Sequence, residues 1–236
     1  MIIILASRWD QTSRAVASRW APLDVRILTA RDLSIVGWRQ QQSAPDGDTA
    51  VAERKLVPHE KITGVLTLLP CVFEEELTEI VPEDRGYVAS EMTAFLLFWL
   101  SRLRCPVLNR PTPACLSGPY WRREKWVRIA AQAGIPVEPV HRHSSPPDCP
   151  SEEGALPLST TMTVIGDRVF GEGEPALQGY ALHLARLAQV ELLAVRFSGP
   201  ERGAYFVRAD VLPDLSHAGM ADAVLELIRS GQKGWA

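Results

Sequence analysis

Residues 2–29 read IIILASRWDQTSRAVASRWAPLDVRILT, and this stretch decides the class of fold. The run Ile2–Ala6 is apolar throughout and rich in β-branched residues, which is typical of a strand buried on both faces. Asp10 is a suitable N-cap for a helix that continues to Trp20. Residues 24–29 then have the pattern of a second strand. A strand, a helix and a strand in succession predict a parallel sheet.

The charge balance and the apolar runs narrow the classes of partner. The 236 residues include 25 Lys and Arg and 28 Asp and Glu, a net charge of −3, which gives no general attraction to nucleic acid or acidic membranes. No apolar run approaches the roughly 20 residues of a membrane span, and the apolar start lacks the basic region of a signal peptide. The four cysteines have no CxxC spacing. We therefore expect a cytoplasmic location with reduced thiols, no nucleic-acid partner and no membrane partner.

Further elements are expected between the second strand and residue 137. They are, in chain order, a hairpin of residues 50–56 with 62–68, a helix at 85–103, a short strand at 106–109 and a helix at 119–133. The helix at 85–103 carries a broad apolar stripe, which favours burial against a sheet. Gly134 is predicted to adopt the left-handed conformation that ends the following helix.

The composition changes at residues 141–157, HRHSSPPDCPSEEGALP, where four prolines occur in 17 residues. This segment is predicted to be a linker or loop. A smaller α+β unit is expected beyond it. Its elements are a hairpin of 161–165 with 168–170, a helix at 176–188, strands at 190–197 and 204–211, and a helix at 220–230.

Two groups of motifs follow one another in a recognisable order. The first consists of VLNRP at 107–111, Lys125 and AGIP at 133–136. The second consists of TMTVIGDRVFGE at 161–172, LARLAQVELLAVRF at 184–197 and GAYFVRADVLPD at 203–214. Their order and spacing resemble the ATP-grasp superfamily, in particular its RimK-like, glutathione-synthetase-like and microviridin-ligase-like members.

The resemblance implies an α/β fold in two parts. Residues 1–118 would form a Rossmann-like pre-ATP-grasp domain, and residues 119–236 a reduced α+β ATP-grasp-like domain with the Pro-rich loop at 141–157. The family's strand-rich lid would be largely missing, because only residues 138–160 separate the two groups of motifs. The lid lysine that contacts the phosphates then has no counterpart.

The chain also departs from the family where magnesium would bind. Arg196, Arg208 and Asp210 align with the family's acidic and amide ligands. Mg²⁺ requires hard oxygen ligands, and guanidinium groups repel it. The resemblance therefore implies a homologue that has lost Mg-ATP ligase activity and has no cofactor, no metal ligand and no catalytic residue.

The first functional hypothesis is an accessory subunit that binds a ligand or a partner. Its ligand would be an anionic small molecule or a peptide, because arginine forks suit carboxylate and phosphate. A protein partner or a homodimer is expected as well. The residues expected at the ligand site are Asn109, Arg110, Arg122, Lys125, Arg196, Arg208 and Asp210.

Two other functional classes remain open. The first is an ATP-dependent carboxylate–amine (peptide) ligase that a second chain completes and that binds ATP and Mg²⁺. The second is a structural subunit, whose interface would use tryptophans expected at the surface. These are Trp9, Trp20, Trp38 and Trp121.

Three weaker patterns favour ordinary structure over function. The basic residues at 122–128 are typical of a half-buried amphipathic helix more than of a nucleic-acid site. His141 and His143, with Asp148 and Cys149, favour a solvated loop over a metal site. Residues 7–10, SRWD, replace the glycines that a dinucleotide cofactor requires after the first strand.

Overall fold

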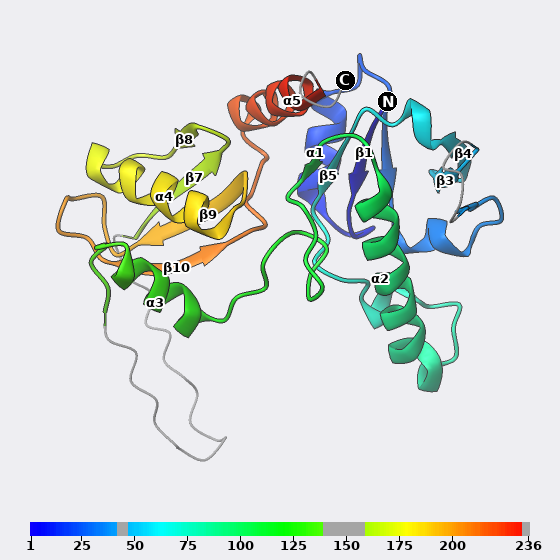
Figure 1. Cartoon of the computed structure of the whole chain (residues 1–236), viewed down its shortest axis with the longest axis horizontal. Helices are drawn as coiled ribbons and strands as arrows, with labels where there is room; N and C mark the ends of the chain where they lie inside the picture. Colours follow the sequence, from blue (N-terminus) through cyan, green and yellow to red (C-terminus); the bar gives the residue numbers. More distant parts are fainter. Residues whose placement is uncertain (42–46, 139–158, 233–236) are drawn as a thin grey trace. The chain divides into compact units, whose positions relative to one another are not determined.

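The computed structural model describes residues 1–41, 47–138 and 159–232. It shows a mixed α/β chain that divides into two compact units (Figure 1). The first unit comprises Met1–Tyr120 and Asp214–Ala236, and the second comprises Trp121–Pro213. The Pro-rich segment predicted at 141–157 lies outside the described residues, which resume at Ser159.

The first unit is built on a four-stranded parallel sheet of order β2-β1-β5-β6. Its strands are β1 (Ile2–Leu5), β2 (Val25–Leu28), β5 (Gly64–Thr67) and β6 (Val107–Leu108). β1 is buried along its whole length, as its apolar sequence predicts. The parallel sheet predicted from residues 2–29 is therefore confirmed. That this unit is a Rossmann-like pre-ATP-grasp domain stays a prediction.

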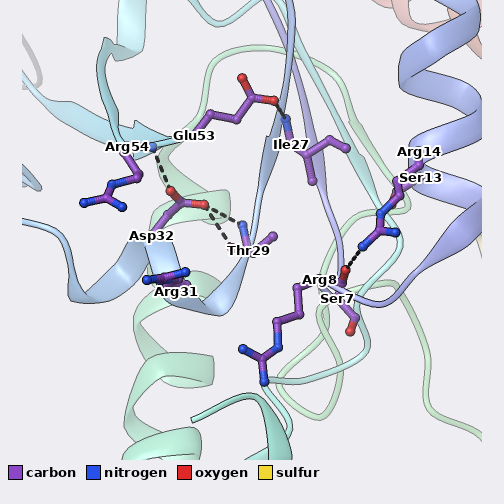
Figure 2. Close-up of a pocket in the computed structure, with 10 residues that line it drawn as sticks. All are labelled: Ser7, Arg8, Ser13, Arg14, Ile27, Thr29, Arg31, Asp32, Glu53 and Arg54. Carbon is purple, nitrogen blue, oxygen red and sulfur yellow. Dashed lines mark hydrogen bonds between the residues drawn. The ribbon is translucent and has the colours of Figure 1, made fainter. Parts of the chain in front are cut away.

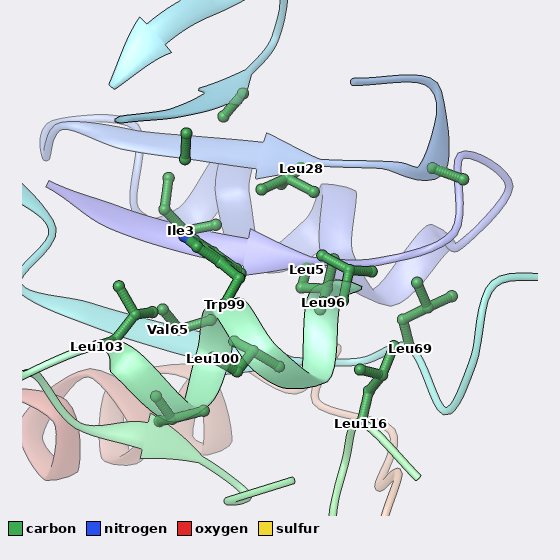
Figure 3. Packing of buried hydrophobic residues seen from close by; sticks show 14 of the residues in the cluster. Ile3, Leu5, Leu28, Val65, Leu69, Leu96, Trp99, Leu100, Leu103 and Leu116 are labelled. Carbon is green, nitrogen blue, oxygen red and sulfur yellow. The ribbon is translucent and has the colours of Figure 1, made fainter. Parts of the chain in front are cut away.

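Helices cover the parallel sheet. α1 (Gln11–Arg19) begins at Asp10, whose carboxylate accepts the amide hydrogens of Thr12 and Ser13 at 3.2 and 2.8 Å. α2 (Arg85–Arg102) packs on Ile3, Leu5 and Val65 through an apolar face formed by Leu96, Trp99, Leu100 and Leu103 (Figure 3). The predicted capping residue and the predicted apolar stripe are both confirmed.

A last helix, α5 (Ala218–Gln232), also belongs to the first unit. A Cβ atom at Gly64 on β5 would lie 2.3 Å from Cγ2 of Ile228, so the two elements are in close contact. Arg19 of α1 forms an ion pair with Asp222 of α5 at 2.8 Å. Residues 214–232 thus belong to the first unit, so the two compact units divide the chain differently from the predicted domains of residues 1–118 and 119–236.

The predicted hairpin of residues 50–56 with 62–68 is wrong. The hairpin joins β3 (Thr49–Ala52) to β4 (Lys55–Pro58), while residues 64–67 form a central parallel strand. Its turn is the pair Glu53-Arg54, with φ of 51° and 61°. Two left-handed residues are what a two-residue hairpin turn requires, but Glu and Arg give no sequence signal for it.

The loops of the first unit contain short 3₁₀ helices. These are η1 (Ala30–Ser34), η2 (His59–Lys61), η3 (Glu74–Glu76) and η4 (Pro82–Asp84).

Two tryptophans expected at the surface are buried or half-buried in the first unit. Trp20 is 2% exposed, and Trp38 packs edge-on against Phe95 and Trp99.

The second unit is an antiparallel sheet of order β10-β9-β7-β8 with helices on one face. The strands are β7 (Thr160–Ile165), β8 (Arg168–Phe170), β9 (Leu192–Phe197) and β10 (Phe206–Asp210), and the helices are α3 (Arg123–Gln132) and α4 (Pro175–Ala188). The elements predicted for this region are confirmed in type, although α3 begins four residues after the predicted start. Gly134, with φ of 72°, follows α3 as predicted.

In the described part of the chain, no helix combines the length and the hydropathy required to cross a membrane.

Candidate functional site

One face of the antiparallel sheet in the second unit is apolar and packs on helices. Val195 and Phe197 of β9 are fully buried and pack with α3 and α4 in one core. Arg196 lies between them in sequence, so its side chain projects from the opposite face. In the ladder Arg208 of β10 is directly opposite Arg196, after an irregularity that follows Phe206. The face opposite the helices therefore presents two arginine side chains from paired positions of neighbouring strands.

Asp210 completes this arginine face. It pairs with Ala194 and lies two residues beyond Arg208, so it projects from the same side of the sheet. Its Oδ1 accepts the amide hydrogen of Leu212 at 2.9 Å, which orients the carboxylate. We refer to Arg196, Arg208 and Asp210 as the arginine face.

The two arginines of this face differ in their surroundings. Arg196 is partly buried, and its Nε and Nη2 donate to Oγ of Ser159 at 3.0 and 2.6 Å. Arg208 is exposed and makes no ion pair or side-chain hydrogen bond within the described residues. One guanidinium is thus held in place and the other is open to a ligand.

Arg122 and Lys125 lie at the start of α3. Arg122 precedes the helix, and its carbonyl accepts the amide hydrogens of Lys125 and Trp126 at 3.0 and 3.2 Å. Nζ of Lys125 lies 4.0 Å from the ring centroid of Trp121, a cation–π contact. Because α3 packs on the apolar face of the sheet, these two residues belong to an element on the side opposite the arginine face.

Asn109 and Arg110 follow β6 in the first unit. Asn109 is 1% exposed, and its amide donates to the carbonyl of Ser117 at 3.3 Å. The Thr67 hydroxyl lies 3.1 Å from the carbonyl oxygen of Asn109. Asn109 therefore fixes the loop after β6, while Arg110 is exposed. Of the seven predicted residues, Asn109 and Arg110 thus lie in the first unit and the other five in the second, where Arg196, Arg208 and Asp210 share one face.

No family model and no curated protein matches the sequence, whereas several solved structures are similar to the structure of this chain. The macrocyclase MdnC from Microcystis aeruginosa MRC, bound with its precursor peptide MdnA, superposes with a TM-score of 0.71 at 9% identity, over 98% of this chain and 100% of that one. A RiPP-associated ATP-grasp ligase from Chryseobacterium gregarium, in complex with ADP and a leader and core peptide, gives 0.66 at 12% identity over 97% and 96%. This chain has an ATP-grasp-like fold.

A third structure with an ATP-grasp-like fold is similar to this chain. It is the RimK domain protein from Sphaerobacter thermophilus, with a TM-score of 0.52 at 12% identity over 97% of this chain and 100% of that one. The recognition of the fold from the sequence motifs is confirmed.

The arginine face does not fit a magnesium ion. It offers one carboxylate, that of Asp210, while Arg196 and Arg208 place two positive charges beside it. Mg²⁺ takes carboxylates, phosphate oxygens and water in an octahedral array, and a guanidinium at contact distance opposes it by several kcal/mol. Among the described residues, no group of three His, Cys, Asp or Glu side chains lies together as metal ligands do. The candidate metal residues His141, His143, Asp148 and Cys149 lie outside these residues.

Sequence reasoning missed one group of residues. Ser7 and Arg8 follow β1, and Arg31 and Asp32 follow β2, where they line a pocket in the first unit. The signal was present, because polar residues directly after parallel strands gather at one edge of a sheet. The SRWD segment at 7–10 was interpreted only as the absence of a glycine-rich loop.

Proposed function

We propose that this protein is an ATP-grasp-like accessory subunit that binds an acidic peptide and does not turn over Mg-ATP by itself. The observation that carries the proposal is the pairing of Arg196 with Arg208 on one face of the second unit. Two like charges directly opposite one another destabilise a sheet. A ligand with anionic oxygens would remove this cost, which gives the pair a use in binding.

Arginine is suited to such a ligand. Its planar guanidinium presents a fork of donors that binds carboxylate through two parallel hydrogen bonds. The Ser159 hydroxyl holds the guanidinium of Arg196, so less side-chain entropy is lost when the ligand binds. Two of the similar structures were solved with precursor or leader and core peptides, which supports a peptide as the ligand.

Calorimetry with two matched peptides tests this proposal. A peptide of alternating Glu and Gly is expected to bind, and the same peptide with Gln in place of Glu is expected to give no heat. Replacing both Arg196 and Arg208 with Ala should weaken the first titration at least tenfold. Arg128→Ala is the matched control, because Arg128 is an exposed arginine of α3. Equal affinity of the double variant and the wild type would overturn the proposal.

Turnover of ATP is tested separately. The chain alone, with ATP and Mg²⁺ and with either peptide, is expected to release no ADP, because the arginine face lacks the carboxylates that would hold the metal. Magnesium-dependent ADP release by the chain alone, abolished by Asp210→Asn, would refute this part of the proposal.

A second candidate function is a carboxylate–amine ligase that another chain completes. The observation that favours it is the similarity over 97% of the chain to a ligase in complex with ADP. In this case the second chain would supply the lid and its lysine. Adding the products of neighbouring genes to the ATP assay distinguishes the two functions, because ADP release in the mixture alone would select the ligase.

A cytoplasmic location and association with a partner protein or a second copy complete the proposal. Trp9 is 53% exposed, and exposed aromatic residues are typical of the centres of interfaces. Sedimentation of the wild type and of Trp9→Ser tests whether the chain self-associates through this residue.

A further inference from the structure

The first unit contains a pocket of about 290 Å³ that is separate from the arginine face (Figure 2). It lies at the carboxyl ends of β1 and β2, the edge of a parallel sheet where ligands bind in open α/β folds. Its volume is near the lower end of the range for small-molecule sites, roughly 300–1,000 Å³. It is lined by Ser7, Arg8, Ser13, Arg14, Ile27, Thr29, Arg31, Asp32, Glu53 and Arg54.

The two acidic groups of this pocket are already engaged by the backbone. Oδ2 of Asp32 accepts the amide and hydroxyl hydrogens of Thr29 at 3.0 and 3.1 Å, and Oδ1 accepts the amide hydrogen of Arg54 at 3.0 Å. Glu53 accepts the amide hydrogen of Ile27 at 3.2 Å. Asp32 is 5% exposed, so it serves as a structural anchor for the pocket wall.

Three arginines of the pocket, by contrast, have hydrogen-bond donors available for a ligand. Arg31 and Arg54 are exposed, and within the described residues their guanidinium groups form no ion pair and no hydrogen bond. The guanidinium of Arg8 stacks on Trp9 at 4.4 Å, and its buried Nε has no hydrogen-bond partner in the described part of the chain. A buried donor without a partner costs free energy that a ligand oxygen would recover.

The fourth arginine stiffens the pocket. The guanidinium of Arg14, on α1, donates to the carbonyl of Arg8 and so ties the loop after β1 to the helix (Figure 2). The hydroxyl of Ser7 accepts the amide hydrogen of Trp9 at 3.3 Å, which leaves the hydroxyl hydrogen for a further acceptor. These contacts hold Ser7 and Arg8 ready to donate.

Arg54 reaches the pocket through an unusual backbone. Glu53 and Arg54 are consecutive residues with positive φ, a conformation that costs free energy in residues other than glycine. The hydrogen bonds from the Arg54 amide to Asp32 and from the Ile27 amide to the Glu53 carboxylate hold this turn against the end of β2. The turn therefore brings the cationic side chain of Arg54 to the edge of the parallel sheet, although Arg54 does not follow a strand of that sheet in the sequence.

We propose that this pocket binds a small molecule that carries a phosphate monoester. Four arginines and two carboxylates give the pocket a net charge of +2, which the two negative charges of a phosphate monoester balance. Its oxygens suit the forks of Arg8 and Arg31 and the hydroxyl of Ser7. The site is distinct from the one in the proposed function, because all of its residues belong to the first unit.

Titrations of the full chain with three probes test this proposal by calorimetry or by NMR. The probes are inorganic phosphate, ribose 5-phosphate and malonate. Both phosphates are expected to bind at low ionic strength and to weaken as salt is added. Tighter binding of ribose 5-phosphate than of phosphate identifies a phosphate ester as the ligand. Malonate binding as tightly as both phosphates would overturn the choice of phosphate, and no binding of either phosphate at millimolar concentration would overturn the site.

Matched variants locate the binding. Arg31→Gln combined with Arg54→Asn should weaken the binding of ribose 5-phosphate at least tenfold, and Asn tolerates the positive φ at position 54. Arg104→Gln is the control, because Arg104 is an exposed arginine of the same unit outside the pocket. Full affinity in the Arg31/Arg54 variant would refute the site. Loss of affinity in the Arg196/Arg208 variant, with the Arg31/Arg54 variant unchanged, would assign the phosphate to the arginine face instead.

Discussion

The indole Nε1 of Trp99 donates a hydrogen bond to Nε2 of His59 at 2.8 Å in the interior of the first unit. Nε2 must therefore carry a lone pair, which is the neutral form of the ring with hydrogen on Nδ1. The pKa of His59 is lowered mainly because burial penalises the charged ring, and Arg102 acts in the same direction, while Asp48 opposes both.

This hydrogen bond predicts that the stability of the folded protein decreases as the pH is lowered. As the pH drops below about 6.5, the unfolded chain binds a proton at residue 59 while the folded chain, with its lower pKa, does not. The unfolded state is thereby favoured, until the pH also falls below the pKa of the folded state. Urea unfolding at pH 7.5 and 5.5 measures the loss, which for one group is at most about 1.4 kcal/mol per pH unit.

His59→Gln is the control for this pH dependence. The amide oxygen of Gln can still accept from Trp99, but Gln does not titrate. The variant should lose less stability than the wild type between the two pH values. An equal loss would show that His59 does not contribute to the pH dependence.

The contact between Gly64 and Ile228 predicts a compensating pair of substitutions. Gly64→Ala places a methyl group 2.3 Å from Cγ2 of Ile228 and should cost roughly 1–3 kcal/mol through overpacking. Ile228→Ala should cost about 2–5 kcal/mol by leaving a cavity. The double variant should lose less than the sum, because the new methyl group enters the space that Ile228 vacates. Free energies of unfolding that simply add would contradict the contact between β5 and α5.

The cysteines predict a pattern of chemical labelling. Burial raises the pKa of the Cys105 thiol to about 11, so almost none of it is thiolate at pH 8. Burial also raises the pKa of half-buried Cys71, with a further contribution from Glu75. Iodoacetamide followed by mass spectrometry should leave Cys105 unmodified in the folded protein and should modify it in urea. Rapid labelling of Cys105 without urea would show that its surroundings open to solvent.

On the arginine face, a substitution that removes one charge is predicted to stabilise the folded protein and to weaken binding of the acidic peptide. Arg208→Gln removes the like charge opposite Arg196 and should raise the free energy of unfolding by a few tenths of a kcal/mol. The Glu-rich peptide should raise the melting temperature of the wild type but not of this variant. A variant that is less stable than the wild type, and still stabilised by the peptide, would indicate a purely structural role for Arg208.

Much of the fold follows from local sequence patterns. The apolar run Ile2–Ala6, the capping residue Asp10 and the left-handed Gly134 each act through their immediate neighbours, so their sequence signals are reliable. The turn at Glu53-Arg54 was not predicted, because the sequence has no glycine or asparagine there. Tertiary hydrogen bonds hold it instead, from the Arg54 amide to Asp32 and from the Ile27 amide to Glu53.

In the candidate sites, too, some features follow from local sequence and others depend on tertiary packing. The aligned motifs were sufficient to single out Arg196, Arg208 and Asp210, which the structure places on one face, while their role in binding stays a prediction. They could not show that Asn109 is turned inward to Ser117, since burial depends on how loops pack. The polar residues after β1 and β2 did signal the pocket of the first unit, but the wall formed by Glu53 and Arg54 comes from a separate segment and had no sequence signal.

The position of α5 affects how the chain is made. Residues 121–213 form an uninterrupted segment that is translated before the helix that covers Gly64. A chain that ends near residue 213 therefore contains the whole second unit while its first unit still exposes apolar surface, and we expect such a chain to bind chaperones through that surface. Any recombinant version of the first unit must join residues 1–120 to 214–236.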